Sequence, residues 1–161
     1  MNIKKVAISP AQIERGKKLF PFKGLKNSIT KGLGNMIGAV GEIVVCDTYG
    51  GVQQNTYDYD LLINGYKIDV KTKNLSRKAT PQDGWNAQVS DFNTTQKCDF
   101  YCFVFVTDDF KTAFIGGFIA KDRFYEKATF NKKGEVNGYL GWVYKSNCYN
   151  IPLRELRYPK K

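Results

Sequence analysis

The sequence of 161 residues predicts an α/β fold in the broad sense, an α+β arrangement in which a central mixed β-sheet is flanked by helices. The strongest indication is Asn64-Gly65 between two runs of strand-forming residues, the usual pattern of a tight β-hairpin. A second is that residues 32–46 carry a single charge, a composition typical of a buried helix. Because 42% of the residues are hydrophobic, the chain can bury a core, and its length fits a single domain, residues 1–161.

A first helix is expected near the N-terminus. Ser9-Pro10 has the pattern of a helix N-cap followed by the first helical residue. Because proline interrupts helical hydrogen bonding, this helix should end at about Phe20, before Pro21.

A second helix should begin near Ser28 or Asn35 and end at Thr48, before a pair of glycines. Between Gly32 and Cys46 the only charged residue is Glu42, and apolar residues cover most of the helix circumference. We therefore expect Glu42 to be buried, where a carboxylate requires a pairing partner or a metal ion.

The hairpin should pair residues 57–63 with residues 66–73. Counted outward from the turn, the expected cross-strand pairs are Ile63–Tyr66, Asp60–Asp69 and Asp58–Lys71. Further strands are expected at residues 100–106 and 112–120, followed by a short helix at residues 121–127. Residues 149–156 should form a docking turn or a helix.

The charge is unevenly distributed. The whole chain carries 25 Lys and Arg against 15 Asp and Glu, a formal charge of +10. Residues 1–33 hold eight basic residues and one acid, so we expect a basic N-terminal helical arm, whereas residues 34–66 contain no Lys or Arg. Because no apolar segment is long enough for a membrane span or a signal peptide, we expect a soluble cytoplasmic protein that does not enter the membrane.

The chain has no histidine, and this excludes several catalytic classes. Ser-His-Asp and Cys-His triads, and zinc sites with histidine ligands, are ruled out. Acid–base chemistry would have to use carboxylates, lysine, tyrosine or a metal-bound water. The four cysteines lack the spacing of a disulfide framework or zinc site and should be reduced and mostly buried.

The hairpin concentrates acidic side chains on one face. Because side chains alternate along a strand, Asp69 and Lys71 share a face, and the expected register adds Asp60 and Asp58 to it. A solvated hairpin face is the simple interpretation, but like charges directly opposite each other are destabilising unless a cation lies between them. Together with Glu42, this set favours a site for Mg²⁺ or Mn²⁺ that hydrolyses phosphodiester bonds.

These residues resemble the PD-(D/E)XK, or restriction-endonuclease-like, nuclease superfamily. Gly41-Glu42 matches the helix element, Asp60 or Asp58 the middle acid, and Asp69-Val70-Lys71 the signature tripeptide, although no proline precedes the middle acid. The resemblance implies that Glu42, Asp60, Asp69 and Lys71 are catalytic. It further implies that the Val70 carbonyl joins the metal ligands and that Gln88, on the following strand, contributes to the site.

A basic rim around an acidic metal site would attract a polyanion, and we expect this partner to be DNA. The residues expected to contact nucleic acid are Lys17, Lys18, Lys23, Lys67, Lys73, Arg77, Lys78 and Gln88. Trp85 fits base stacking, although a packing role is favoured. Two alternative functions stay open: a non-catalytic nucleic-acid-binding module, and an interaction subunit that docks through its basic arm. The formation of a homodimer also stays open.

Overall fold

The computed structural model describes residues 3–25, 33–138 and 141–159, with only the backbone described for residues 20–25 and 33–35. The helices are α1 (Pro10–Leu25), α2 (Leu33–Tyr49) and α3 (Lys121–Lys127). The strands are β1 (Lys4–Ala7), β2 (Val52–Gln53), β3 (Leu61–Ile63), β4 (Tyr66–Leu75), β5 (Asn86–Ser90), β6 (Phe100–Thr107), β7 (Thr112–Ala120), β8 (Thr129–Asn131) and β9 (Cys148–Pro152).

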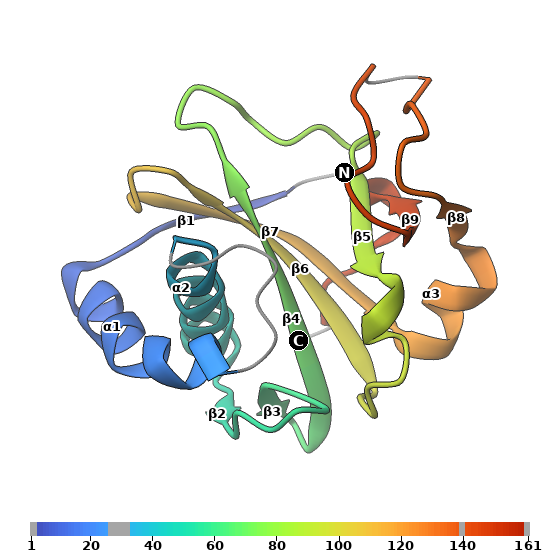
Figure 1. Cartoon of the computed structure of the whole chain (residues 1–161). Coiled ribbons are helices and arrows are strands. Elements are labelled where there is room, and N and C mark those ends of the chain that lie inside the picture. The colour runs from blue at the N-terminus through green and yellow to red at the C-terminus, as the bar shows by residue number, and fades with distance from the viewer. Residues whose placement is uncertain (1–2, 26–32, 139–140, 160–161) are drawn as a thin grey trace.

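The strands form two sheets. The larger sheet has six strands in the order β1-β7-β6-β4-β3-β2, and the smaller has three in the order β5-β9-β8. β4 and β6 are parallel neighbours, whereas the other paired strands run antiparallel. Figure 1 shows α1 and α2 on one side of the curled larger sheet, with the smaller sheet and α3 on the other. The predicted α+β class, a mixed sheet flanked by helices, is therefore confirmed.

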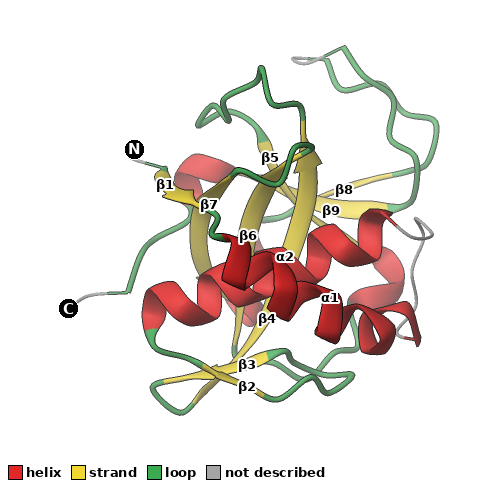
Figure 2. Cartoon of the chain, turned by 90° about the vertical axis from the view of Figure 1, so that its left-hand side faces the viewer, coloured by secondary structure: helices red, strands yellow, loops and turns green. Residues whose placement is uncertain are grey.

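Two hydrophobic cores lie on the two faces of the larger sheet. The first lies under α1 and α2 and includes Val40, Val44 and Val104, and Figure 2 shows these helices crossing the face of β4 and β6. The second joins the larger sheet to the smaller one and to α3, with Phe103 and Phe124 stacked at 5.8 Å between ring centroids. Because both faces are covered, the middle strand β6 is buried along nearly its whole length.

The first helix begins as predicted but ends later than predicted. The Gln12 N–H donates to Ser9 Oγ, and the Ser9 N–H donates to Gln12 Oε1, a reciprocal capping box. The predicted end at Phe20 is wrong, because α1 continues through Pro21 to Leu25. This helix packs on α2, and such tertiary contact outweighs the hydrogen bond that a proline removes.

The predicted end of α2 is confirmed within one residue. Gly50 adopts a positive φ of 66°, and the Gly51 N–H donates to the Cys46 carbonyl at 2.8 Å. This is the Schellman arrangement, which only a residue tolerant of the left-handed region closes without strain. The strands predicted at residues 100–106 and 112–120 and the helix at 121–127 are also confirmed.

Other segments differ from the prediction. The stretch predicted as a basic helical arm contains β1, which pairs with β7 at the sheet edge, as well as α1. The C-terminal segment forms β9 and then a 3₁₀ turn, Leu153–Glu155, so it supplies a strand as well as a turn. In the described part of the chain, no helix is long and apolar enough to cross a membrane.

Candidate active site

The candidate site lies at the middle of β4. Val70 contributes to the core beneath α2, whereas Asp69 and Lys71 project from the opposite face of the strand, as strand alternation predicts. Lys71 Nζ lies 2.7 Å from Asp69 Oδ2, in an ion pair whose carboxylate side chain is only 2% exposed and whose lysine side chain is 17% exposed. A pair this deeply placed depends on good geometry to offset its desolvation.

Gln96 supplies that geometry, and sequence reasoning missed it. The side chain of this buried residue accepts a hydrogen bond from Lys71 Nζ at 2.8 Å and donates to Asp69 Oδ1 at 3.3 Å. It also donates to the Tyr57 carbonyl at 2.9 Å, while its own backbone carbonyl accepts a hydrogen bond from Lys121 Nζ. Gln96 therefore holds both members of the ion pair. No motif surrounds it in the sequence that would have marked this role.

Asp60 reaches the same tripeptide from the position just before β3, the hairpin partner of β4. The β3–β4 ladder confirms the predicted Ile63–Tyr66 pair but ends at Leu61–Ile68, because the Asp60 N–H donates to the Ile68 carbonyl, one residue out of register. The predicted Asp60–Asp69 pair is therefore not part of the ladder. Instead, Asp60 Oδ2 accepts a hydrogen bond from the Val70 N–H at 2.8 Å. The Asp60 carboxylate, 1% exposed as a residue, thus replaces a backbone carbonyl as the partner of Val70.

Asp58 has a different position. The predicted Asp58–Lys71 pair is wrong, because the chain leaves the ladder before this residue and Asp58 Oδ1 accepts a hydrogen bond from the Lys97 N–H at 3.0 Å. This contact fastens the segment that carries Gln96 to the hairpin. Of the two acids matched to the middle position of the motif, only Asp60 hydrogen-bonds to the tripeptide through its carboxylate in the described structure.

The charges of the site act on a neighbouring thiol. Burial raises the pKa of Cys98 to about 12, with further increases from the Asp69 and Asp60 carboxylates, while Lys121 and Lys71 act in the opposite direction. These four charged groups therefore all lie within electrostatic range of one thiol, which stays protonated at neutral pH. All four cysteines are free thiols, and three of them are buried, as predicted.

Glu42 is fully buried, as the sequence predicts, but it lies on the helix layer and not on the strand that carries Asp69 and Lys71. It belongs to α2, which covers the face of β4 opposite to Lys71. Gly41 brings the helix close to the strand there, since a Cβ added at this position would lie 2.3 Å from Thr72 Oγ1. Across the described ranges, no group of three or more Asp, Glu, Cys or His side chains is arranged to hold a metal ion.

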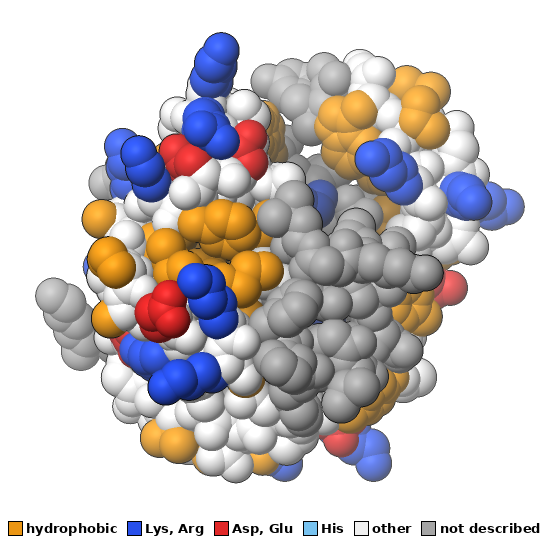
Figure 3. Space-filling model, turned by 60° about the vertical axis from the view of Figure 1, so that its left-hand side comes forward, with side chains coloured by type: hydrophobic (Ala, Val, Ile, Leu, Met, Phe, Trp, Pro, Cys, Tyr) orange, Lys and Arg blue, Asp and Glu red, His pale blue; other side chains and the backbone are white. Residues whose placement is uncertain are grey.

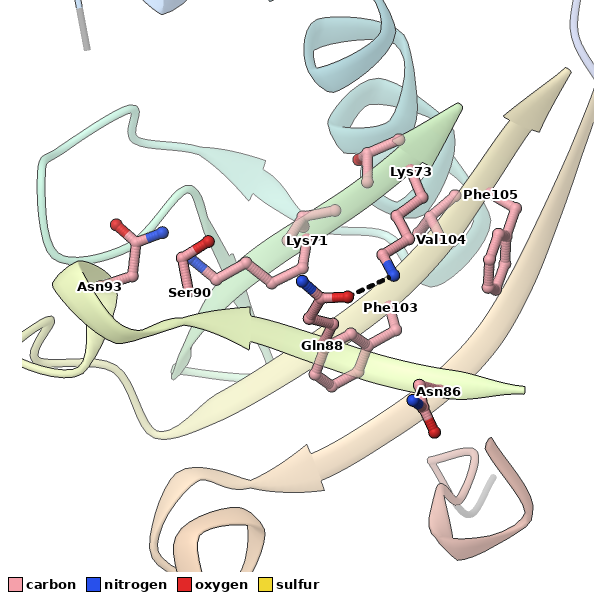
Figure 4. A pocket seen from close by; sticks show the side chains of 11 residues that line it. Lys71, Lys73, Asn86, Gln88, Ser90, Asn93, Phe103, Val104 and Phe105 are labelled. Carbon is pink, nitrogen blue, oxygen red and sulfur yellow. Dashed lines mark hydrogen bonds between the residues drawn. The ribbon is translucent and has the colours of Figure 1, made fainter. Parts of the chain in front are cut away.

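Two adjoining cavities extend from the site along β4. The first, of about 250 Å³, lies between β4 and β5, with Lys71 and Lys73 on one wall and Gln88 on the other. Figure 4 shows both lysines pointing toward β5, where Lys73 Nζ donates to Gln88 Oε1 at 2.8 Å. The second cavity, of about 400 Å³, shares Lys73 and is lined by Trp85 and Trp142.

The position of Gln88, which is expected to contribute to the site, follows from the arrangement of the two sheets. Its strand, β5, follows β4 in the chain but belongs to the smaller sheet, where it pairs with β9. Gln88 therefore faces Lys73 across the cavity, and its side-chain oxygen accepts from that lysine. Trp85 is half-buried and makes an edge contact with Phe105 at 5.9 Å between ring centroids, so it packs as well as lining a cavity.

The other predicted nucleic-acid contacts are spread over the surface. Lys17 is exposed and pairs with Glu14 at 3.0 Å, and Arg77 pairs with Asp108 at 2.8 Å. Lys67 lies over the Tyr59 ring at 5.5 Å. On the face in Figure 3, basic side chains form small separate groups beside acidic ones. Lys18 and Lys78 are also exposed, and the Lys23 side chain lies outside the described residues.

Replacing Lys73 with methionine should stabilise the protein at pH 7. Burial lowers the pKa of Lys73 from 10.5 to about 8, so folding disfavours its charged form. This cost is fully present below pH 8, declines as the pH rises from 8 to 10.5, and is absent above 10.5, where the amine is neutral in both states. We expect Lys73→Met to gain about 1–3 kcal/mol at pH 7 and to lose this advantage between pH 8 and 10.5, measured by urea unfolding.

Lys111→Met is the control for this measurement, because Lys111 is exposed in the turn between β6 and β7. Its difference from the wild type should be small and independent of pH. A destabilised Lys73→Met protein at pH 7 would mean that the hydrogen bond to Gln88 outweighs the desolvation of the amine.

No protein-family model matches the chain, and no curated protein matches it. The functional assignment therefore depends on the motif in the sequence and on the side-chain geometry described above.

Proposed function

We propose that this protein is a metal-dependent nuclease with a restriction-endonuclease-like core, which hydrolyses phosphodiester bonds in DNA. The observation that carries the proposal is the arrangement on β4. A buried Asp69–Lys71 ion pair is held by Gln96, and the Asp60 carboxylate binds the backbone between them. Burying two carboxylates and a lysine together costs stability, and sites that retain such groups are frequently functional.

The donor atoms fit Mg²⁺ or Mn²⁺. Asp60 and Asp69 offer carboxylate oxygens and Val70 a backbone carbonyl, and Mg²⁺ commonly uses one or two carboxylates and several waters. Glu42, from α2, is the further carboxylate that the resemblance implies. When bound, the ion lowers the pKa of a coordinated water and offsets charge on the phosphate.

Lys71 would act on the attacking water in this proposal. Its ammonium group has three donors, of which the described contacts place one on Asp69 and one on Gln96. The third would orient the water toward the phosphorus atom. The same positive charge would lie close to the negative charge that develops on the phosphate oxygens, which is where charge stabilisation lowers the barrier most.

A cleavage assay tests this function. Purified protein is incubated with Mg²⁺ or Mn²⁺ and plasmid DNA, single-stranded DNA, a branched DNA junction or RNA. We expect cleavage of DNA, which EDTA abolishes, and full activity in the control variant Lys111→Ala. Cleavage that persists in EDTA would contradict the proposal.

The same assay separates the two alternatives when it is combined with a binding measurement. Binding of nucleic acid without turnover on any substrate would support a non-catalytic binding module. If the protein neither binds nor cleaves any of these substrates, the result would support an interaction subunit that docks on an acidic protein through its basic residues. The net charge of +10 on the chain suits such a partner.

A further inference from the structure

Lys73 has no role in the proposed hydrolysis, yet it is held in a cavity where a charge is costly. Its described partners are the neutral oxygen of Gln88, at 2.8 Å from Nζ, and the ring of Trp142, whose centroid lies 5.9 Å from Nζ. Neither partner is an anion. Lys73 is half-buried, and charges withdrawn from water are retained mainly where they are paired, so this lysine suits a negatively charged ligand.

The first cavity has the lining of an anion site. Besides Lys71 and Lys73 it exposes the hydrogen-bonding side chains of Asn86, Gln88 and Ser90. None of the described residues that line it carries a carboxylate. The charge of Lys71 is already balanced by its ion pair with Asp69. Lys73 is therefore the positive charge that is available to a phosphate in the first cavity.

The second cavity has a different lining and continues from the first. It is mainly apolar and contains Trp85 and Trp142, while Lys73, Asn86 and Phe105 line both cavities. Indole rings are stacking platforms for nucleobases, and amide side chains such as Asn86 hydrogen-bond to base edges. A cationic compartment beside an aromatic one matches the two ends of a nucleotide.

We propose that the two cavities together bind one unpaired nucleotide, with its phosphate at Lys73 and its base against Trp142 and Trp85. As an assignment of the substrate, this rests on the proposed nuclease function. A base inside a duplex is paired and stacked on both faces, so it must leave the helix to meet these rings. Because Lys71 lines the first cavity, the bound nucleotide lies next to the proposed reaction centre, and the preferred substrate is single-stranded or locally unpaired.

Intrinsic fluorescence tests the proposal directly, because the only two tryptophans in the chain line the second cavity. The wild-type protein is titrated in EDTA with single-stranded oligothymidylate, the matching duplex, thymidine monophosphate, thymidine and inorganic phosphate. We expect saturable quenching by the single strand and by the monophosphate. Thymidine and inorganic phosphate should each bind at least about tenfold more weakly, because each lacks one half of the recognised group.

Three variants assign the signal to residues. Lys73→Met should weaken binding of the monophosphate about tenfold or more without loss of stability, and Trp142→Leu should weaken it and remove part of the quenching. Phe130→Leu, an exposed aromatic residue on β8, is the matched control and should bind as the wild type does. Unchanged affinity in both Lys73→Met and Trp142→Leu would overturn the proposal.

The remaining outcomes separate this inference from the nuclease itself. Equal quenching by duplex and single strand would overturn the requirement for an unpaired base, and equal affinity for phosphate and the monophosphate would overturn base recognition. Cleavage without quenching would overturn the proposed nucleotide site but would support the proposed nuclease function. Quenching without cleavage on any substrate would support the nucleotide site while the nuclease fails.

Discussion

Asp69→Asn and Lys71→Ala should each lower the rate of DNA cleavage by about 10²- to 10⁴-fold, the range expected when a group that positions or activates a proton is lost. Asparagine keeps the size of the aspartate and an oxygen for Gln96, but it lacks the charge that pairs with Lys71 at 2.7 Å. Alanine removes the ammonium group from the cavity wall. Both changes act on the proposed reacting centre, so turnover at saturating DNA should fall.

Single-turnover cleavage with Mg²⁺ measures the rate, and binding in EDTA measures the affinity, which should be nearly unchanged. Asp83→Asn and Lys111→Ala repeat the two chemical changes at exposed positions and should keep wild-type rates. Thermal melting checks the fold, because Lys71→Ala leaves a buried carboxylate without its cation. Weaker binding with unchanged turnover at saturation would instead place both residues among the contacts to the substrate.

Gly41→Ala should destabilise the protein, in contrast to the same change at Gly38 on the same helix. The new Cβ would lie 2.3 Å from Thr72 Oγ1 and 2.6 Å from Thr72 Cγ2, so helix and strand must separate. Overpacking of this kind costs about 1–3 kcal/mol, and more where the backbone cannot shift. Gly38→Ala, one turn earlier, meets nothing within 4 Å and should stabilise the protein by about 0.5–1 kcal/mol through helix propensity alone.

Thr72→Ala provides the second arm of a double-mutant cycle measured by urea unfolding. Thr72 Oγ1 is buried and has no hydrogen-bond partner among the described residues, so its removal should cost little. In the double variant the nearest remaining contact of the new methyl group is the Thr72 Cβ at 3.0 Å, and most of the lost stability should return. Equal destabilisation by Gly41→Ala and by the double variant would show that the clash lies elsewhere.

The features that were predictable from sequence are those set by neighbours in the chain. Asn64 and Gly65 both adopt positive φ, at 51° and 80°, as the tight hairpin turn requires, and so the innermost pair of the register was correct. The shared face of Asp69 and Lys71 follows from strand alternation alone. The burial of Glu42 follows in the same way from the apolar residues around it.

The remaining features depend on contacts between distant segments. β1 pairs with β7, placing Lys4 opposite Ile115, and no local pattern specifies such a partner. Asp60 leaves the predicted register because the loop before it makes its own hydrogen bonds, from the Thr56 N–H to the Tyr59 carbonyl. Gln96 lies in an irregular segment where neither helical nor strand periodicity identifies a buried side chain.

The pairing of β5 has a consequence for the order in which the protein matures during translation. β4, which carries Asp69 and Lys71, and its neighbour β6 both leave the ribosome well before β9, the described ladder partner of β5. Until β9 emerges, β5 lacks that partner, and the wall that holds Gln88 opposite Lys73 is not fixed. Sheet growth around the Asp69–Lys71 ion pair therefore precedes the closing of the cavity between β4 and β5, so a nascent chain gains the proposed reactive groups before the wall of the proposed ligand site is complete.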